Sequence, residues 1–232
     1  MIPYVLATGV LWTLSATTAL TVGMILATAS VGGRAGARLL AETAITVTRG
    51  VPTSLLVVTA GIITVRISPP AWLPNPFPQT PSSLRLLGWA VVAALALGSA
   101  GHLAVIFRTA YAALGPYRTQ QATVLGVRPW SRLALLAREA AATALPPTGA
   151  RLVHHLHNTA FAALFPVADL FGWVQEEANA TFQVSRYALI GAGVYVALSW
   201  LIWSAFRALE ARLLLKPANA VRRTLQLPAS TR

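Results

Sequence analysis

Long apolar runs alternate with short polar segments along most of the chain. A helix needs about 20 apolar residues to cross the hydrocarbon core of a membrane. Four runs meet this requirement, at 5–29, 42–65, 86–107 and 187–206. A fifth run, 145–164, is more polar because it contains an arginine, three histidines and an asparagine. The pattern predicts an all-α integral membrane protein with about five transmembrane helices.

Basic residues are unequally distributed between the segments that link these helices. If the N-terminus is outside, the segments 31–41 and 108–144 and the tail from residue 207 are cytoplasmic and together hold 13 Lys and Arg residues. The external segments 66–85 and 165–186 then hold 3. Because cytoplasmic loops of membrane proteins carry an excess of Lys and Arg, this count predicts an N-outside, C-inside topology.

Composition supports the membrane class. The chain is 56% hydrophobic and 10% charged, whereas a soluble domain is about a quarter charged. Its net charge of +12 could also suit a nucleic-acid-binding surface, but the basic residues lie between long apolar runs, so no nucleic-acid partner is expected. The absence of cysteine excludes disulfides and thiolate metal sites. The first run resembles a signal peptide near residues 27–29, but it is too long and lacks a basic start, so we expect it to be retained.

The chain divides into one transmembrane domain over 1–216 and a basic cytoplasmic tail over 217–232. The tail follows Lys216-Pro217 and is expected to fray. Within the external loop 66–85, six of the fourteen residues at 68–81 are proline. Proline fixes φ and donates no backbone hydrogen bond, so this loop should be irregular.

Common catalytic motifs are absent from the sequence. A phosphate-binding P-loop needs Gly-Lys-Ser/Thr, but the only lysine, Lys216, precedes a proline. Neither GxGxxG nor GxSxG occurs, and the chain has only 6 acidic residues. We therefore expect that the chain is not an enzyme.

Three histidines, His154, His155 and His157, form the one cluster that could hold a metal ion. Imidazole binds zinc and copper well, and residues three apart share a helix face. However, no carboxylate follows at helical spacing, and zinc sites use three or four ligands. The other interpretation is a polar helix face along a water-filled substrate route.

The basic segment 117–132 predicts two short helices separated by a break. About two helical turns precede Gly126, which can end a helix. Pro129 suits the first turn of a second helix, which would run to about Ala144, before Pro146-Pro147. Such a platform could dock onto another protein or lie on anionic lipid, and periodicity alone leaves both open.

The same segment resembles the cytoplasmic EAA loop of ABC importer permeases, with Gln120-Gln121-Ala122, three further residues and then Gly126 in place. Other landmarks are similar to the polar amino-acid subfamily, which includes histidine, glutamine, glutamate, arginine and opine importers. They are Arg49-Gly50-Val51-Pro52, Val105-Ile106-Phe107-Arg108, Leu145-Pro146-Pro147 and His157-Asn158-Thr159-Ala160-Phe161. The five landmarks follow the family order over about residues 8–212.

The chain departs from the family pattern at several landmarks. Gln120 replaces the glutamate of the loop motif, and Gln121 replaces its first alanine. No proline occurs near Ala137-Arg138, where the loop normally closes with Leu-Pro. His157 and Asn158 replace a lysine and an aspartate. The resemblance therefore implies a divergent permease, with ligand preferences of its own or as the less typical half of a heterodimer.

The resemblance implies a permease that forms half of the translocation path for a small polar solute, such as an amino acid or a derivative. Its partners would be a second permease chain, a cytoplasmic ATPase dimer that holds ATP and Mg, and an extracytoplasmic solute-binding protein. It would be a multi-pass protein of the bacterial cytoplasmic membrane, with no cofactor and no metal of its own. Alternatives are a membrane-bound enzyme that uses the histidine cluster, a secondary transporter, or a structural partner permease.

The resemblance also implies two groups of site residues. Those expected to couple to the ATPase are Arg118, Gln120, Gln121, Ala122, Gly126 and Arg128. Those expected along the translocation path are Arg49, Pro52, His157, Asn158 and Thr159.

Overall fold

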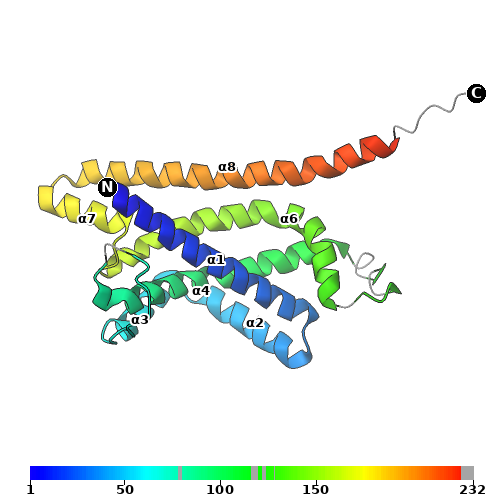
Figure 1. Cartoon of the computed structure of the whole chain (residues 1–232), viewed down its shortest axis with the longest axis horizontal. Helices are drawn as coiled ribbons and strands as arrows, with labels where there is room; N and C mark the ends of the chain where they lie inside the picture. The colour runs from blue at the N-terminus through cyan, green and yellow to red at the C-terminus, as the bar shows by residue number, and fades with distance from the viewer. Residues whose placement is uncertain (78–79, 116–119, 122–123, 128, 226–232) are drawn as a thin grey trace, which may run out of the picture.

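The structure of the chain, a computed structural model, consists of helices and connecting segments, with no strand among the residues described (Figure 1). The structure describes residues 1–77, 80–115, 120–121, 124–127 and 129–225, of which 129–138 and 213–225 are described by their backbone only. The elements are, in order, α1 (Ile2–Gly32), α2 (Ala35–Gly50), α3 (Thr53–Thr64), η1 (Ser82–Leu84), α4 (Arg85–Ala112), α6 (Pro129–Asn158), η2 (Thr159–Leu164), α7 (Leu170–Thr181) and α8 (Val184–Leu225). The predicted all-α class is confirmed.

Three helical segments are long and apolar enough to cross a membrane: Ile2–Gly32, Ser82–Ala112 and Val184–Arg212. The helices α2 and α3 meet the same criterion only as a pair. The described residues therefore hold three candidate spans, or up to four if this pair is one span. These spans support a membrane protein, but the predicted fifth span at 145–164 is not among them.

The connecting segments gather at two ends of the molecule (Figure 1). The N-terminus, the link between α3 and α4, and α7 lie at one end, whereas the α1–α2 link, the start of α6 and the end of α8 lie at the other. These are the two groups that the arginine count assigned to opposite sides of a membrane. The arrangement is compatible with the predicted N-outside, C-inside topology, which itself stays a prediction.

The central helix is α4, and α1 packs along it through a row of mostly small residues. Six of the nine buried residues of α1 recur at every fourth position: Ala7, Leu11, Ser15, Ala19, Gly23 and Ala27. Small residues at this spacing let two helices approach closely inside a membrane. A Cβ atom added at Gly23 would lie 2.9 Å from Leu103 Cβ and 3.0 Å from the backbone oxygen of Ala100. The α1–α4 contact therefore leaves no room for a side chain there.

The segment predicted as a spanning helix at 42–65 is divided between two helices, α2 and α3. α2 and α3 are bent by 96° at the break between them. Val51 is extended, with φ −92° and ψ 125°, because a following proline disfavours the helical region. Pro52 has no backbone N–H to continue the ladder, and it becomes the N-cap of α3.

The helix α6 joins two elements that the sequence predicted as separate. A cytoplasmic helix was expected to end near Ala144, before a span at 145–164. Instead one helix, Pro129–Asn158, includes Pro146-Pro147 and leads into η2. Prolines inside a helix remove hydrogen bonds and kink it, and α6 turns sharply without ending (Figure 1). The prediction that Pro129 lies in the first turn is confirmed.

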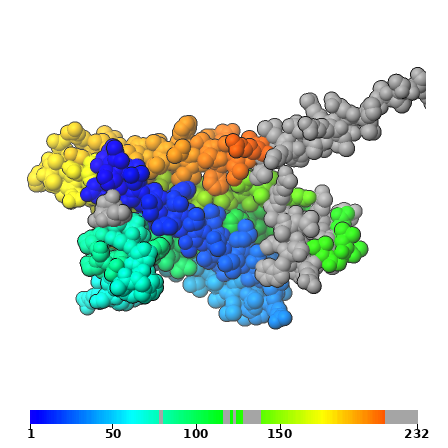
Figure 2. Space-filling view, in the orientation of Figure 1, coloured from blue at the N-terminus to red at the C-terminus, as the bar shows by residue number. Residues whose placement is uncertain are grey.

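The helix α8 is longer than its predicted apolar run at 187–206. Its backbone stays helical through Lys216-Pro217 to Leu225, so the tail does not fray where it was expected to, and 226–232 lie outside the described residues. α8 follows one edge of the molecule (Figure 2). Only 6% of its most apolar window is buried. Such a face suits contact with lipid or with a second membrane chain.

The proline-rich loop packs on the start of α4. Its described residues are irregular, as predicted, apart from η1. Asn75 donates a hydrogen bond to the backbone oxygen of Thr80 (2.8 Å), and the indole of Trp89 donates one to Pro74 (2.9 Å). Phe77 is buried beside Gly88. The loop therefore closes one end of the helical bundle.

The helix α7 is capped by a buried carboxylate. Asp169 accepts hydrogen bonds from the backbone N–H groups of Phe171 (3.1 Å) and Gly172 (3.0 Å). Burial raises the pKa of Asp169 from its ordinary value of 3.8 to about 6, although these two bonds act to lower it. The cap fixes the segment that links η2 to α7.

We expect the capping role of Asp169 to be visible in stability. Asp169→Ala should cost about 1 kcal/mol, because it leaves backbone donors unpaired. Asp169→Asn keeps an acceptor but cannot titrate. Since the pKa of Asp169 is raised in the folded state, this group should stabilise the fold increasingly as the pH falls from about 6 towards about 4. Thermal unfolding in detergent at about pH 7 and about pH 5 should show this gain in the wild type and less of it in Asp169→Asn; equal pH dependence would contradict it.

Candidate functional site

A cavity of about 300 Å³ lies where the break between α2 and α3 meets α4 and α6. The residues that line it come from these four helices, from the break and from η2: Arg49, Val51, Pro52, Thr53, Ser54, Gly98, His102, Arg151, His154, Asn158 and Phe161. Three of the five predicted path residues, Arg49, Pro52 and Asn158, are therefore brought together. Asn158 is far from the other two in sequence, and the fold alone makes them neighbours.

Two glycines of α4 allow the α2–α3 break to lie this close. A Cβ atom at Gly98 would lie 2.5 Å from the hydroxyl oxygen of Thr53. A Cβ atom at Gly101 would overlap the hydroxyl oxygen of Thr48 and lie 3.0 Å from the backbone oxygen of Ile45. The glycines are about one helical turn apart, so they present one bare face of α4 to both sides of the break.

Arg151 of α6 extends its guanidinium to α4. One terminal nitrogen donates to the backbone oxygen of Gly98 (2.7 Å) and to the hydroxyl of Ser99 (3.2 Å). The Nε atom of Arg151 is buried and has no hydrogen-bond partner among the described residues. His102 of α4 also lines the cavity. Buried polar atoms without partners, such as Nε of Arg151, are rare in proteins.

A buried hydrogen-bond chain fixes Ser99 behind Arg151. Both ring nitrogens of His155 are used, Nδ1 at 2.8 Å from the hydroxyl of Ser99 and Nε2 at 2.8 Å from that of Ser15. The Ser15 hydroxyl donates to the backbone oxygen of Leu11 (2.6 Å), so it accepts from Nε2. His155 is then a neutral ring that accepts from Ser99, which in turn accepts from Arg151. This assignment satisfies every member of the chain across α1, α4 and α6.

The three clustered histidines point in different directions. His154 lines the cavity, and His155 is buried in the chain just described. His157 lies against α8, 3.1 Å from the hydroxyl of Ser199 and edge-on to the ring of Tyr195. Within the described part of the chain, no three His, Cys, Asp or Glu side chains are grouped for a metal ion. The hypothesis of a metal-dependent enzyme therefore lacks a geometric basis in this cluster.

The other two predicted path residues, His157 and Thr159, do not line the cavity. His157 lies at the α8 contact, and Thr159 is buried, with its hydroxyl donating to the backbone oxygen of Leu156 (2.7 Å). His102 and His154 line the cavity in their place. The sequence analysis named His154 only as part of the histidine cluster, and periodicity could not assign it and His102 to one site.

Part of the predicted coupling segment is described. Gln120 and Gln121 are exposed and helical, and Leu125 donates its backbone N–H to Gln121 (3.0 Å). Gly126 follows with φ +69°, a left-handed conformation that ends a helical turn, as predicted. Val124 is 87% exposed and Leu125 is 78% exposed, so this turn presents apolar side chains outward. The predicted coupling residues Arg118, Ala122 and Arg128 lie outside the described residues.

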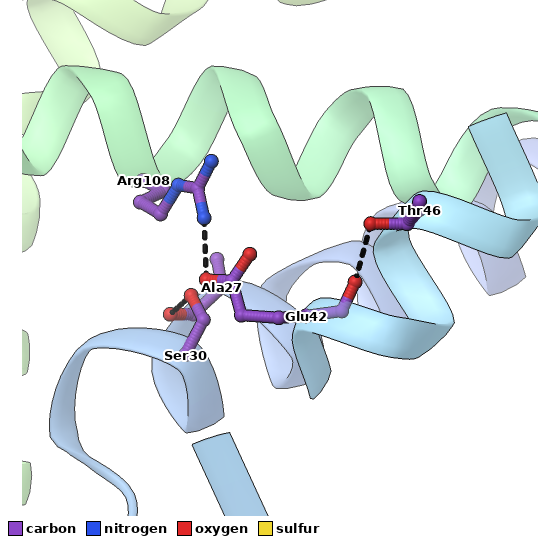
Figure 3. A network of polar contacts seen from close by, with 5 residues as sticks. All are labelled: Ala27, Ser30, Glu42, Thr46 and Arg108. Carbon is purple, nitrogen blue, oxygen red and sulfur yellow. Dashed lines mark hydrogen bonds and ion pairs between the residues drawn. The ribbon is translucent and has the colours of Figure 1, made fainter. Parts of the chain in front are cut away.

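An ion pair ties the end of α4 to α2 near the coupling segment (Figure 3). Arg108, the last residue of the third family-like landmark, donates to the carboxylate of Glu42. Thr46 donates to the backbone oxygen of Glu42 (2.8 Å) and Ser30 to that of Ala27 (2.9 Å). Both partners of the ion pair are partly exposed, so it contributes no more than about 1 kcal/mol to stability.

Comparison with known proteins identifies the fold. No family model matches the chain, and no curated protein matches it. Among solved structures, the chain is similar to a chain of an amino acid ABC transporter crystallised with histidines, with a TM-score of 0.73 and 21% identity over 91% of this chain and 92% of that one. It is also similar to the MetNI methionine ABC transporter in inward-facing conformations, with a TM-score of 0.66 and 16% identity over 90% of this chain and 91% of that one. The chain therefore has the fold of an ABC transporter permease.

Proposed function

We propose that the chain is a permease subunit of an ATP-driven ABC importer. The observation that carries this proposal is the fold match over 91% of the chain. The order of the five sequence landmarks supports it independently. The solute would be small and polar, an amino acid or a derivative of one, since the landmarks resemble that subfamily and the first structural neighbour is an amino acid transporter.

The cavity at the α2–α3 break is the proposed part of the translocation path in this chain. Charged and polar side chains are costly inside a membrane and usually line routes for polar solutes. Arg49, Asn158 and Arg151 supply such groups from α2 and α6. A broken helix also places irregular backbone at this depth, which is tolerated where it lines a cavity. A second permease chain would supply the other half of the path.

The exposed turn ending at Gly126 is the proposed contact with the ATPase. Val124 and Leu125 would bury their apolar side chains in a groove of the ATPase subunit. ATP and Mg would bind in that subunit, so this chain would perform no chemistry. An external solute-binding protein would deliver the solute, and the membrane would be a bacterial cytoplasmic membrane with the C-terminus inside.

Mild-detergent purification of the tagged chain from its native membrane tests this function. We expect an ABC ATPase at a stoichiometric level together with a second permease chain, and ATP hydrolysis by the complex. If the ATPase and second permease co-purify but the intact complex neither hydrolyses ATP nor transports solute, the result would favour a non-transporting structural subunit. A chain that purifies alone, under conditions that keep a known importer intact, would contradict the proposal.

A further inference from the structure

We propose that the cavity at the α2–α3 break binds an anionic group, in particular a carboxylate, of the transported solute. This inference rests on the proposed function, because it takes the cavity to be part of the translocation path. Its electrostatic content, that the cavity attracts anions, can be tested without the ATPase. The supporting features are the charges of the lining, the position of Arg151 beside it and the rigidity of the groups behind Arg151.

The lining of the cavity is cationic. It includes the guanidinium groups of Arg49 and Arg151 and the imidazoles of His102 and His154. No aspartate or glutamate is among the described residues that line it. Two guanidinium groups lining one cavity, without a lining carboxylate to offset them, create a positive potential that attracts anions.

Arg151 lines the cavity and has one terminal nitrogen engaged by α4. Its terminal nitrogen is committed to Gly98 and Ser99, whereas Nε is buried and lacks a partner among the residues described. A guanidinium remains charged in proteins and makes charge-assisted hydrogen bonds to carboxylates. His102 lies beside the same space. An anion in the cavity would be attracted by the guanidinium charge of Arg151, which lines it.

The position of Arg151 is fixed before any solute arrives. The chain from Ser15 through His155 to Ser99 is fully buried and connects α1, α4 and α6. Because each hydroxyl and ring nitrogen has its partner, the acceptor at Ser99 is held in place for the guanidinium. Such preorganisation reduces the entropy lost on binding. It also gives a role to hydroxyl and imidazole groups at positions where apolar side chains would otherwise pack.

The absence of cysteine allows a direct test of the potential in the cavity. Ser54 lines the cavity and is partly exposed, so Ser54→Cys places a single thiol there. Its rates of reaction are measured in permeabilised native membranes with two methanethiosulfonate reagents, one carrying a sulfonate and one carrying a trimethylammonium group. Ala71→Cys, in the exposed proline-rich loop, provides the reference ratio of the two rates. We expect the ratio of the rate with the anionic reagent to the rate with the cationic reagent to be about tenfold higher at the cavity thiol than at this reference thiol.

Arginine variants in the Ser54→Cys background connect the potential to its source. Arg151→Gln and Arg49→Gln should each reduce the preference, and Arg151→Lys should retain most of it. Arg49 is exposed in this structure, so its variant keeps the test valid if Arg151→Gln does not fold. Arg66→Gln is the control, because it removes the same charge beyond the far end of α3. At the rise of a helix, Arg66 is about 18 Å from Ser54, so this variant should leave the preference for the anionic reagent unchanged. Equal rates for both reagents, or a preference for the cation, would overturn the proposal.

Protection from labelling tests the carboxylate itself. Glutarate, a dianion, should slow the reaction of the Ser54→Cys thiol with the anionic reagent, whereas glutaramide, its neutral diamide, should not. Protection by glutarate should be lost when Arg151→Gln is added. Equal protection by both compounds, or none by either, would contradict a carboxylate site. Because labelling needs no ATPase, failure here is distinguishable from failure of the importer assignment, which depends on co-purification.

Discussion

Gly101→Ala should destabilise the folded chain by about 1–3 kcal/mol and abolish most of its transport activity. The added methyl group would overlap the hydroxyl of Thr48 and press on the backbone oxygen of Ile45, 3.0 Å away. The threonine could rotate, but the backbone of α2 could yield only by moving away from α4. The α2–α3 break would then shift, and with it Arg49, whose Cγ atom lies 3.0 Å from the same methyl position. Thermal unfolding in detergent and solute uptake by the assembled transporter measure the two effects.

Gly193→Ala in α8 is the matched control. A Cβ atom at Gly193 meets nothing within 4 Å, and both glycines lie inside apolar helices. Alanine is favoured over glycine in a helix by up to about 1 kcal/mol, so Gly193→Ala should stabilise or leave stability unchanged. If both variants behaved alike, the close contact between the α2–α3 break and α4 would be wrong. A stable Gly101→Ala with normal uptake would also contradict the placement of the cavity.

The apolar pattern predicted most of the helices, because the length of an apolar run is what a membrane selects. It failed where the backbone preferences of proline and its neighbours determine whether a helix continues. The apolar run over 42–65 continues through Val51-Pro52, so a hydropathy average cannot detect the 96° bend there. The signal was present in Pro52, which disfavours a helical residue before it. The opposite error occurred at Pro146-Pro147, where the helix continues through both prolines.

The candidate site was predictable only in part, for a similar reason. Arg49, Pro52 and Asn158 were identified from sequence landmarks, and they do line one cavity. The chain behind Arg151 was missed because its members lie 140 and 56 positions from their partners in sequence. Periodicity reports which residues share a face of one helix, not which faces of three helices meet. A serine inside an apolar run was the available signal, but it indicated no partner.

Substitutions at Gly126 should weaken coupling to an ATPase in the order of the energy that each residue needs to adopt the left-handed backbone conformation there. Gly126 has φ +69°, which asparagine tolerates, alanine adopts at a cost of about 1 kcal/mol or more, and proline cannot adopt because its ring fixes φ near −65°. We expect Gly126→Asn to retain most ATPase co-purification and ATP hydrolysis. Gly126→Ala should reduce both, and Gly126→Pro should abolish both while the chain still inserts and stays folded. The recovered ATPase per permease chain, with the hydrolysis rate, measures the series.

The order of the series separates backbone geometry from side-chain bulk. No atom lies within 4 Å of a Cβ at Gly126, so a methyl group there would clash with nothing described in the chain itself. If bulk against the ATPase decided the outcome, asparagine, which is larger, would be worse than alanine. If the left-handed turn decides it, alanine is the worse of the two, since the conformation that presents Val124 and Leu125 would be lost. Normal assembly and hydrolysis with Gly126→Pro would show that this turn is not the contact, because proline must change its conformation.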